Sequence, residues 1–308
     1  MLSYQASSKA TDTQLVWFDR AGKQIGRLGE PAQYGFVELS PDGKRVSVSV
    51  PDQAADERRD TWIYDVTRGV GTRFTFDPAN DGPSIWSPDG SRIVFSSDRK
   101  GHFDLYQRAS NASGSEELLF EDNLLKTPTS WSPDGKFILY TASVDRGSEL
   151  VTGTGSDLFI LPFSGRRRPV PLLQSPFNEF GGKFSPDGRW VAYTSNESGR
   201  NEIYVIPFAG SGGKWRVSTA GGVCQRWPGD GKEIFYIGAD NKLMAASVNG
   251  NRSTFEVGTV KPLFETRLGQ PGCPYSVSPD GQQFLINTQM VVSAPITVVL
   301  NWTAGLNK

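Results

Sequence analysis

The chain has 308 residues, of which 37% are hydrophobic and 11% aromatic, and its formal net charge at pH 7 is −1. The balanced charge argues against nucleic acid as a partner, because phosphate binding needs an electropositive surface. A single histidine excludes a histidine-rich metal site, and we expect no cofactor. The 34 glycines and 20 prolines suit many turns between short strands. Composition therefore favours one closed all-β domain.

The polar residues 1–13 are expected to form a flexible N-terminus, followed by one domain over residues 14–308. Residues 15–19 and 25–28 are predicted strands, with a turn between them. They precede the first copy of the repeat that organises the rest of the chain. We therefore interpret them as the outer half of a unit whose inner half lies elsewhere in the sequence.

The repeat is a Ser-Pro-Asp-Gly tetrapeptide, which occurs intact at residues 40–43, 87–90, 132–135, 185–188 and 278–281. A degraded copy, Pro-Gly-Asp-Gly, stands at residues 228–231. The aspartates of successive copies are separated by 47, 45, 53, 43 and 50 residues. A period in the forties that contains several strands is typical of a propeller blade. The sequence thus predicts a six-bladed β-propeller of four-stranded antiparallel blades.

Each repeat predicts four strands, which we name a to d from the inside of the blade outward. Strand a ends at the apolar or aromatic residue before Ser-Pro-Asp-Gly, and the tetrapeptide turns the chain into strand b. Strands b and c are nearly continuous apolar runs, as expected when neighbouring blades cover both faces of a sheet. The aspartate of the turn is expected to be structural, because its side chain can accept hydrogen bonds from nearby backbone N–H groups.

The last repeat has strand a near Tyr275, strand b at residues 283–287 and an expected strand c at residues 296–302. It lacks strand d, so an N-terminal strand is expected to complete this blade, which closes the ring and removes an exposed edge. The N-terminal segment contains two predicted strands, whereas the last blade lacks only strand d. The sequence does not decide which of them docks.

Two cysteines, Cys224 and Cys273, lie near the start of an innermost strand in adjacent repeats and match no metal-binding or redox spacing. A disulfide between them is an alternative, but two small buried thiols are the expected state.

The five intact tetrapeptides and the recurrent strands with an acidic residue, apolar residues and tyrosine resemble the PD40, or TolB-like, branch of six-bladed propellers over nearly the whole chain. More narrowly, residues 15–20, 213–222 and 295–302 resemble the C-terminal propeller half of bacterial membrane-anchored serine/threonine protein kinases. The kinase motifs of that family are not found in this sequence. The resemblance implies a sensor or interaction half, which is extracytoplasmic if it belongs to such a kinase and cytoplasmic otherwise.

Motifs for enzymatic chemistry are missing from the sequence. It contains no Gly-x-Ser-x-Gly nucleophile elbow and no phosphate-binding loop. The longest apolar segment, residues 290–302, is short and contains Pro295, so we expect no membrane insertion. No N-terminal signal peptide is recognised.

A ligand site is expected on the face opposite the tetrapeptide turns, where the d–a and b–c connections surround the mouth of the channel. Polar residues stand about five positions before the end of strand a, and Arg226 is close to them in sequence. Convergent polar groups at a concave mouth are a default binding site. The predicted ligand-binding residues are Tyr34, Asp81, Lys126, Glu179 and Arg226.

Two b–c connections, at residues 51–60 and 143–156, are longer than the others. Insertions on one face of a repeat protein often form its binding face, although loop drift explains them as well. The predicted partner-binding residues are Asp56, Arg58, Arg59, Asp145, Arg146 and Glu149.

The sequence thus favours a non-enzymatic binding or sensor propeller that recognises a protein, a peptide or a small ligand at the channel mouth. Two alternatives remain: a hydrolase or lyase with polar groups in the channel, and a scaffold that contributes only its shape. We expect a monomer with a protein or peptide partner.

Overall fold

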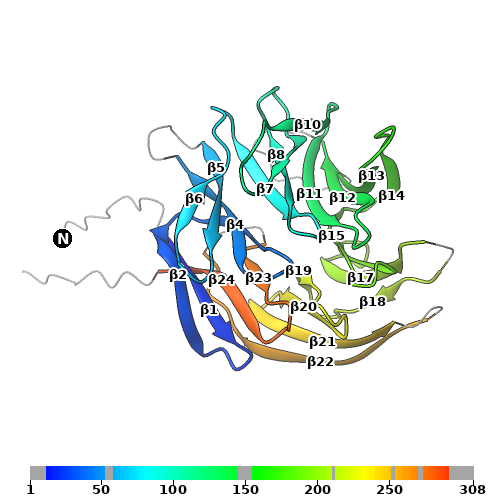
Figure 1. Ribbon diagram of the computed structural model, residues 1–308. Helices are drawn as coiled ribbons and strands as arrows, with labels where there is room; N and C mark the ends of the chain where they lie inside the picture. The colour runs from blue at the N-terminus through cyan, green and yellow to red at the C-terminus, as the bar shows by residue number, and fades with distance from the viewer. Residues whose placement is uncertain are drawn as a thin grey trace, which may run out of the picture.

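The structure is a computed structural model, and it describes residues 12–52, 58–144, 155–209, 212–250, 254–269 and 273–290. Strands in these residues form six four-stranded antiparallel sheets, which are arranged as blades around a common centre (Figure 1). The predicted six-bladed propeller is therefore confirmed. In this part of the chain, no helix has the length and apolarity needed to cross a membrane.

Blades 1 to 5 each use four consecutive strands, whose order in the sheet follows the sequence from the channel outward. Blade 1 contains β3 (Gly35–Leu39), β4 (Arg45–Pro51), β5 (Arg59–Asp65) and β6 (Gly71–Arg73). Blade 2 contains β7 (Asp81–Trp86), β8 (Arg92–Ser97), β9 (Asp104–Ala109) and β10 (Glu117–Phe120). Blade 3 contains β11 (Leu125–Trp131), β12 (Phe137–Ser143), β13 (Ser156–Pro162) and β14 (Val170–Leu173). Blade 4 contains β15 (Glu179–Phe184), β16 (Trp190–Ser195), β17 (Glu202–Pro207) and β18 (Trp215–Arg216). Blade 5 contains β19 (Gly222–Arg226), β20 (Glu233–Gly238), β21 (Lys242–Gly250) and β22 (Phe255–Glu265).

Blade 6 closes the ring with strands from both ends of the chain. Its inner strands are β23 (Tyr275–Val277) and β24 (Gln283–Gln289), and its outer strands are β1 (Thr13–Asp19) and β2 (Gln24–Ala32). Figure 1 shows the blue N-terminal strands beside β24. Strand β1 pairs with β24 in unbroken antiparallel register.

Both N-terminal strands therefore dock, which corrects the expected strand count for this blade. Strand β1 occupies the third place, where residues 296–302 were predicted to lie, and β2 occupies the fourth. Residues 296–302 themselves lie outside the described residues. The interpretation of the N-terminal strands as the outer half of a blade is confirmed. Thr13, predicted to belong to the flexible terminus, is a buried residue of β1.

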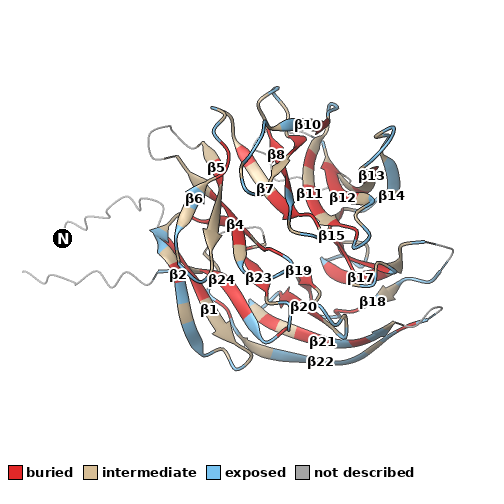
Figure 2. Cartoon of the chain, in the orientation of Figure 1, coloured by how far each residue is buried: buried red, intermediate tan, exposed pale blue. Residues whose placement is uncertain are grey.

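Apolar side chains of strands b and c fill the spaces between blades. One hydrophobic cluster lies at each of the six junctions between neighbouring blades. Consecutive residues such as Ile93, Val94 and Phe95 are all fully buried, because each face of β8 packs against a different neighbour. Figure 2 shows buried residues concentrated in the inner strands, with exposed residues along outer strands such as β22. The apolar runs predicted from the sequence are thus explained by two covered faces.

The five intact tetrapeptides form one hydrogen-bonded turn between strands a and b. In each, the serine Oγ donates to the aspartate Oδ1 at 2.5–2.7 Å, and the backbone N–H two residues after the aspartate donates to the same oxygen at 3.0–3.1 Å. The glycine has a positive φ of 68–76°, which costs glycine little. The hydrogen bond from Ser87 lowers the pKa of Asp89 to about 2. The turn aspartates are thus occupied by their own turns.

Candidate functional site: a charged cavity in the channel

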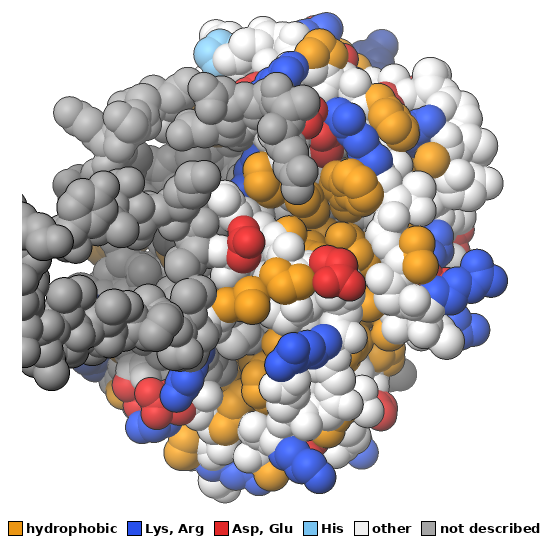
Figure 3. Space-filling model, turned by 90° about the vertical axis from the view of Figure 1, so that its left-hand side faces the viewer, with side chains coloured by type: hydrophobic (Ala, Val, Ile, Leu, Met, Phe, Trp, Pro, Cys, Tyr) orange, Lys and Arg blue, Asp and Glu red, His pale blue; other side chains and the backbone are white. Residues whose placement is uncertain are grey.

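A cavity of about 520 Å³ lies in the channel and is lined by the inner strands of blades 1 to 5. Ser143 and Ser156, which flank the b–c connection of blade 3, and Asn201, which precedes β17, also line it. The cavity therefore reaches the face of the b–c connections, where the sequence predicts a site. Figure 3 shows a face of the molecule on which hydrophobic side chains gather near the centre, with isolated acidic and basic side chains among them.

The predicted ligand-binding residues do not all line this cavity. Arg226 does, whereas Tyr34, Asp81, Lys126 and Glu179 are buried and are absent from its lining. Contact between these four residues and a ligand stays a prediction. The charged residues that line the cavity are Arg226 and two residues that the sequence analysis did not single out, Glu38 and Lys183.

Lys126 illustrates the first group. Its fully buried ammonium lies 2.8 Å from Asp104 Oδ1 and 2.7 Å from Asp122 Oδ1, and it donates to the backbone oxygens of Asp122 and Leu124 at 2.9 and 2.6 Å. Asp104 belongs to β9 of blade 2, so this cluster ties two blades together. Tyr34 is likewise engaged within the fold, where its hydroxyl lies 3.2 Å from the hydroxyl of Tyr64.

The two predicted acids are also held inside the fold. Asp81 lies 3.4 Å from a guanidinium nitrogen of Arg99, and burial raises its pKa to about 6 although the hydrogen bonds and the Arg99 charge oppose that shift. Glu179 accepts a hydrogen bond of 2.5 Å from Ser175 Oγ, and burial raises its pKa too. Both carboxyl groups are less acidic than exposed ones because their charged forms are desolvated.

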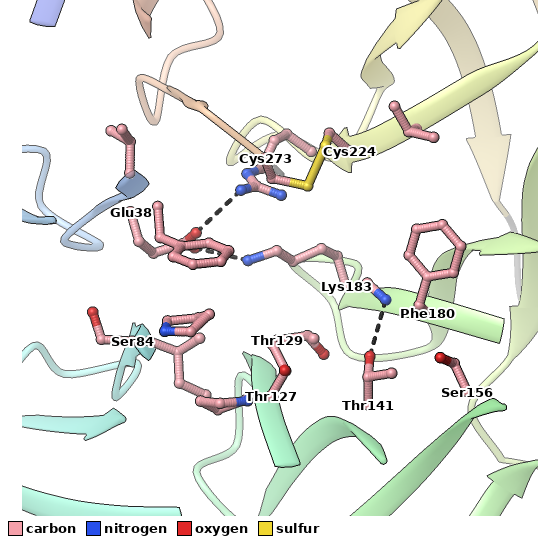
Figure 4. A pocket seen from close by; sticks show the side chains of 18 of the residues that line it. Glu38, Ser84, Thr127, Thr129, Thr141, Ser156, Phe180, Lys183, Cys224 and Cys273 are labelled. Carbon is pink, nitrogen blue, oxygen red and sulfur yellow. Dashed lines mark hydrogen bonds and ion pairs between the residues drawn. A yellow bond between two sulfur atoms is a disulfide. The ribbon is translucent and has the colours of Figure 1, made fainter. Parts of the chain in front are cut away.

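Three charged residues, Glu38, Lys183 and Arg226, line the cavity, and Figure 4 shows the side chain of Lys183 directed toward Glu38. Glu38 of β3 places one carboxylate oxygen 2.9 Å from Lys183 Nζ of β15 and the other 3.4 Å from Arg226 Nη2 of β19. The side chains of Lys183 and Arg226 are only 11% and 10% exposed, and that of Glu38 is 23% exposed. Blades 1, 4 and 5, far apart in sequence, thus meet in one ionic cluster.

Burial and a neighbouring cation lower the pKa of Lys183 to about 8, although Glu38 opposes the shift. Arg226 donates from Nη1 to the Gln225 carbonyl oxygen at 3.1 Å, and its guanidinium lies 5.6 Å from the centre of the Tyr275 ring. Its Nε is buried and has no hydrogen-bond partner among the described residues. The cluster therefore retains donor capacity.

The three blades that supply charges to the cavity share one backbone feature in their inner strands. The residue four positions before the tetrapeptide has a positive φ in these blades: Phe36 (30°), Gly181 (69°) and Cys224 (62°). The strand pairing shifts register near this position, as it also does in blades 2 and 3. Such a β-bulge redirects the side chains that follow it. The charged residue stands two positions later in each blade.

Blades 2, 3 and 6 have a proline at the equivalent position: Pro83, Pro128 and Pro274. Because proline fixes φ near −65°, these strands exclude the left-handed conformation. Their residues two positions later are uncharged: Ile85, Ser130 and Ser276. The six blades thus fall into a proline class and a class with a positive φ at this position, and the second class supplies every charge that lines the cavity in the described chain.

Cys224 and Cys273 form a disulfide, which corrects the prediction of two free thiols. Both residues line the cavity. Their Cα atoms are 5.2 Å apart, because Cys273, two residues before β23, lies beside the bulge of β19 in the neighbouring blade. The bond links blades 5 and 6 and closes a loop with a sequence separation of 49 residues.

The predicted partner-binding loops are described only in part. Asp56, Asp145, Arg146 and Glu149 lie outside the described residues. Arg58 donates to the Pro78 carbonyl oxygen at 2.8 Å, and Arg59 donates to the carbonyl oxygens of Gln33 and Ser49 at 2.6 and 2.9 Å. Arg59 thus fastens the connection that leads into β3.

No group of three or more histidine, cysteine, aspartate or glutamate side chains in the described ranges is arranged to hold a metal ion. The cavity instead offers an ammonium, a guanidinium, one carboxylate and the threonines Thr127, Thr129 and Thr141. This set is suited to binding and orienting a polar group by hydrogen bonds and charge.

Sequence reasoning missed Glu38 and Lys183 because it counted five residues back from the end of strand a. A signal was present two positions before the tetrapeptide, where the six copies have Glu38, Ile85, Ser130, Lys183, Arg226 and Ser276. Charged residues at a position that is apolar or small in the other copies depart from what the repeat requires. Such a departure indicates a role outside the shared fold.

Comparisons with known proteins agree with this architecture. Residues 31–156 match the family model for the TolB beta propeller domain, PD40. A putative TolB from Agrobacterium tumefaciens has a similar solved structure, with a TM-score of 0.67 and 19% identity over 92% of this chain and 100% of that one. At this identity the likeness shows the fold alone. Residues 31–156 of this six-bladed propeller are thus similar to the PD40 repeats of TolB-type propellers.

Two curated relatives match shorter segments. The Tol-Pal system protein TolB of Anaeromyxobacter dehalogenans (strain 2CP-C) is 32% identical over 115 residues, which are 37% of this chain and 24% of that protein. The uncharacterized peptidase YuxL of Bacillus subtilis (strain 168) is 24% identical over 208 residues, which are 55% of this chain and 31% of that protein. The chain matches a third or less of the length of each relative. The narrower resemblance to kinase propellers stays a prediction.

Proposed function

We propose that this propeller is a binding domain that receives part of a protein or peptide partner, or a small ligand, in the channel cavity. The observation that carries the proposal is the cavity itself, whose mainly apolar wall surrounds one cluster of converging charged groups. Pockets of several hundred Å³ with this composition are typical ligand sites. The similarity to TolB proteins supports a binding role.

The long b–c connection of blade 3 fits the same proposal. It leaves the sheet at Ser143 and returns at Ser156, whose hydroxyl oxygens lie 3.0 Å apart at the cavity wall. The charged residues predicted between them, Asp145, Arg146 and Glu149, are therefore connected to the cavity edge at both ends. We propose that they add contacts to a partner. A sensor role is supported by the resemblance to kinase propellers.

The test fills the cavity. Thr127 lines it and is half-buried, so Thr127→Trp places a large side chain in the channel. The matched control is Thr72→Trp on the exposed outer strand β6. Peptides are selected from a random library on the immobilised propeller, and their affinity for both variants is measured by calorimetry. We expect Thr127→Trp to weaken binding by about tenfold or more, or about 1.4 kcal/mol, and Thr72→Trp to leave it unchanged. Equal binding by Thr127→Trp and the wild type, with both folded, contradicts the proposal.

Two observations favour the alternative of a channel enzyme. The chain is similar to a peptidase, and burial lowers the pKa of Lys183 to about 8, which suits a general base near neutral pH. Turnover distinguishes the two functions. Selected peptides incubated with the propeller are analysed by mass spectrometry. Intact peptides support the binding domain, whereas cleavage that disappears in Lys183→Met supports the enzyme.

A further inference from the structure

The ionic cluster of the cavity has more positive than negative charge. Of the described residues that line the cavity, the charged ones are Glu38, Lys183 and Arg226. Two cations share one carboxylate, so the cluster retains one positive charge in a largely buried place. Burying a charge without a counter-charge is costly. A single negative charge from outside would balance the cluster.

The same cluster has unused hydrogen-bond donors. Arg226 Nε is buried without a partner among the described residues, and the ammonium of Lys183 makes one recorded hydrogen bond, to Glu38, although it carries three N–H groups. An unsatisfied buried donor costs about 1–3 kcal/mol. Lys183 and Arg226 both line the cavity, and neither cation is more than 11% exposed at its side chain. Because Arg226 Nε is itself fully buried, the free N–H groups for an incoming acceptor are those of the Lys183 ammonium. The site is therefore built to receive an acceptor.

The surroundings restrict what carries that acceptor. Apolar side chains line much of the same cavity, among them Phe36, Pro83, Ile85, Pro128, Phe180 and Val223. Figure 4 shows the Phe180 side chain on the same cavity as Lys183, on the neighbouring part of β15. A carboxylate matches the guanidinium and ammonium donors by charge and geometry. An apolar group attached to it would lie against the rings and prolines.

We propose that the cavity binds a carboxylate group at Lys183 and Arg226, carried by an apolar moiety such as the C-terminal residue of a peptide or an aryl-substituted carboxylic acid. This inference rests on the proposed function, because it names the chemistry of the ligand in the same cavity. Glu38 holds the two cations in place and competes with the incoming carboxylate.

The pH dependence follows from Lys183. The charged groups that face it are Glu38 and Arg226, and the ring of Tyr275 lies behind Arg226. Lys183 loses its proton as pH rises through about 8. Carboxylate binding is therefore strongest below pH 8 and weakens above it, whereas binding of a neutral analogue stays constant over the same range.

The experiment compares matched acids and amides. The probes are 3-phenylpropionate and 3-phenylpropionamide, and N-acetyl-Ala-Ala-Phe with a free or an amidated C-terminus. Affinities are measured by calorimetry or by NMR titration at pH 7 and pH 9.5. We expect at least one acid to bind about tenfold more tightly than its amide at pH 7, a difference of about 1.4 kcal/mol, and to lose most of this preference at pH 9.5. A preference confined to the peptide assigns a peptide C-terminus, and a preference in both pairs assigns the carboxylate group generally.

Three variants test the residues. Lys183→Met should abolish the acid preference, and Lys183→Arg should keep it at pH 7 and also at pH 9.5. Glu38→Gln should increase acid affinity by removing the competing carboxylate, which a purely structural ion cluster does not predict. Because this last result is a gain, it does not depend on the stability of Lys183→Met.

The failures are distinguishable. If acids and amides bind equally, or if no probe binds while the selected peptides still require an open cavity in the Thr127→Trp test, the carboxylate inference is wrong and the proposed function stands. If neither the probes nor the selected peptides respond to Thr127→Trp, the proposed function fails as well.

Discussion

The two ends of the innermost strands carry charges that behave differently. At the start of β11, Lys126 is fully buried and has four oxygen acceptors around its ammonium. At the end of β15, Lys183 has one recorded acceptor and lies in the wall of a cavity. A buried charge that its own surroundings satisfy holds blades together. A charge left with free donors beside a cavity is available to a ligand.

The largest expected effect comes from removing the buried ion pair of Lys126 at the start of β11. Lys126→Met leaves Asp104, whose side chain is 4% exposed, without its cation. Removing one partner of a buried ion pair typically costs about 3–5 kcal/mol, so the free energy of unfolding in urea should fall by that amount. Lys136→Met is the control, because the Lys136 side chain is 70% exposed and its ion pair with Asp134 should contribute less than about 1 kcal/mol. A loss below about 1 kcal/mol in Lys126→Met contradicts the structural role.

The second prediction concerns pH and Asp81. Its folded pKa of about 6 exceeds the ordinary value of 3.8, so the folded state holds this proton more tightly than the unfolded state. The stabilising contribution is complete below pH 3.8 and is lost as pH rises through about 6. Relative to Asp81→Asn, the wild type should therefore lose up to about 3 kcal/mol between pH 3.5 and pH 7. Unfolding curves at several pH values measure this difference.

The control for this prediction is Asp77→Asn. Asp77 also pairs with Arg99, but the Asp77 side chain is 34% exposed. We expect no comparable pH-dependent difference there. Asp81→Asn should also leave ligand affinity unchanged, because Asp81 does not line the cavity. A stability difference that is independent of pH would contradict the raised pKa of Asp81. A loss of ligand binding in Asp81→Asn would show that this residue belongs to the site.

The third prediction compares the inner strands that have a positive φ with those that have a proline at the same position. Gly181 has a φ of 69°, and an added Cβ would meet only Gln225 Nε2, at 3.6 Å. Gly181→Ala therefore has space, and its cost is the left-handed backbone, about 1–2 kcal/mol. The proline class offers the control: Pro83→Ala removes a proline but requires no positive φ, so a smaller loss of about 0.4–1 kcal/mol is expected. Equal losses in the two variants, measured by chemical denaturation, would argue against two classes of inner strand.

Much of the fold was predictable because its determinants are local. The serine, aspartate and glycine of each turn interact within about five residues, so a tetrapeptide repeated at a regular spacing identified every a–b junction. The place of β1 was not predictable in the same way. Residues 296–302 have the composition of a strand, and only the pairing of β1 with β24 decides which segment takes the third place.

The candidate site was less predictable because it depends on the direction of side chains. A shift of one residue in register moves a side chain to the opposite face of a strand, and the inner strands of blades 1 to 5 contain such shifts at positions that the repeat does not reveal. The count of five residues back from the end of strand a selected Lys126 and did not select Lys183. The disulfide was missed for a related reason, since the approach of two adjacent blades at the channel is a property of the closed ring.

Chemical labelling of amines tests the central claim most directly. Reductive methylation of the folded protein near pH 8 modifies amines that are accessible and partly neutral, and peptide mass spectrometry reports each lysine separately. Lys183 lines the cavity and has a pKa of about 8, whereas Lys126 is fully buried among carboxylates and carbonyl oxygens. We predict that Lys183 is modified in the folded state and protected by a bound acid, while Lys126 is modified only after unfolding. Modification of Lys126 alongside Lys183, or a Lys183 that stays unmodified until the protein unfolds, would contradict the account.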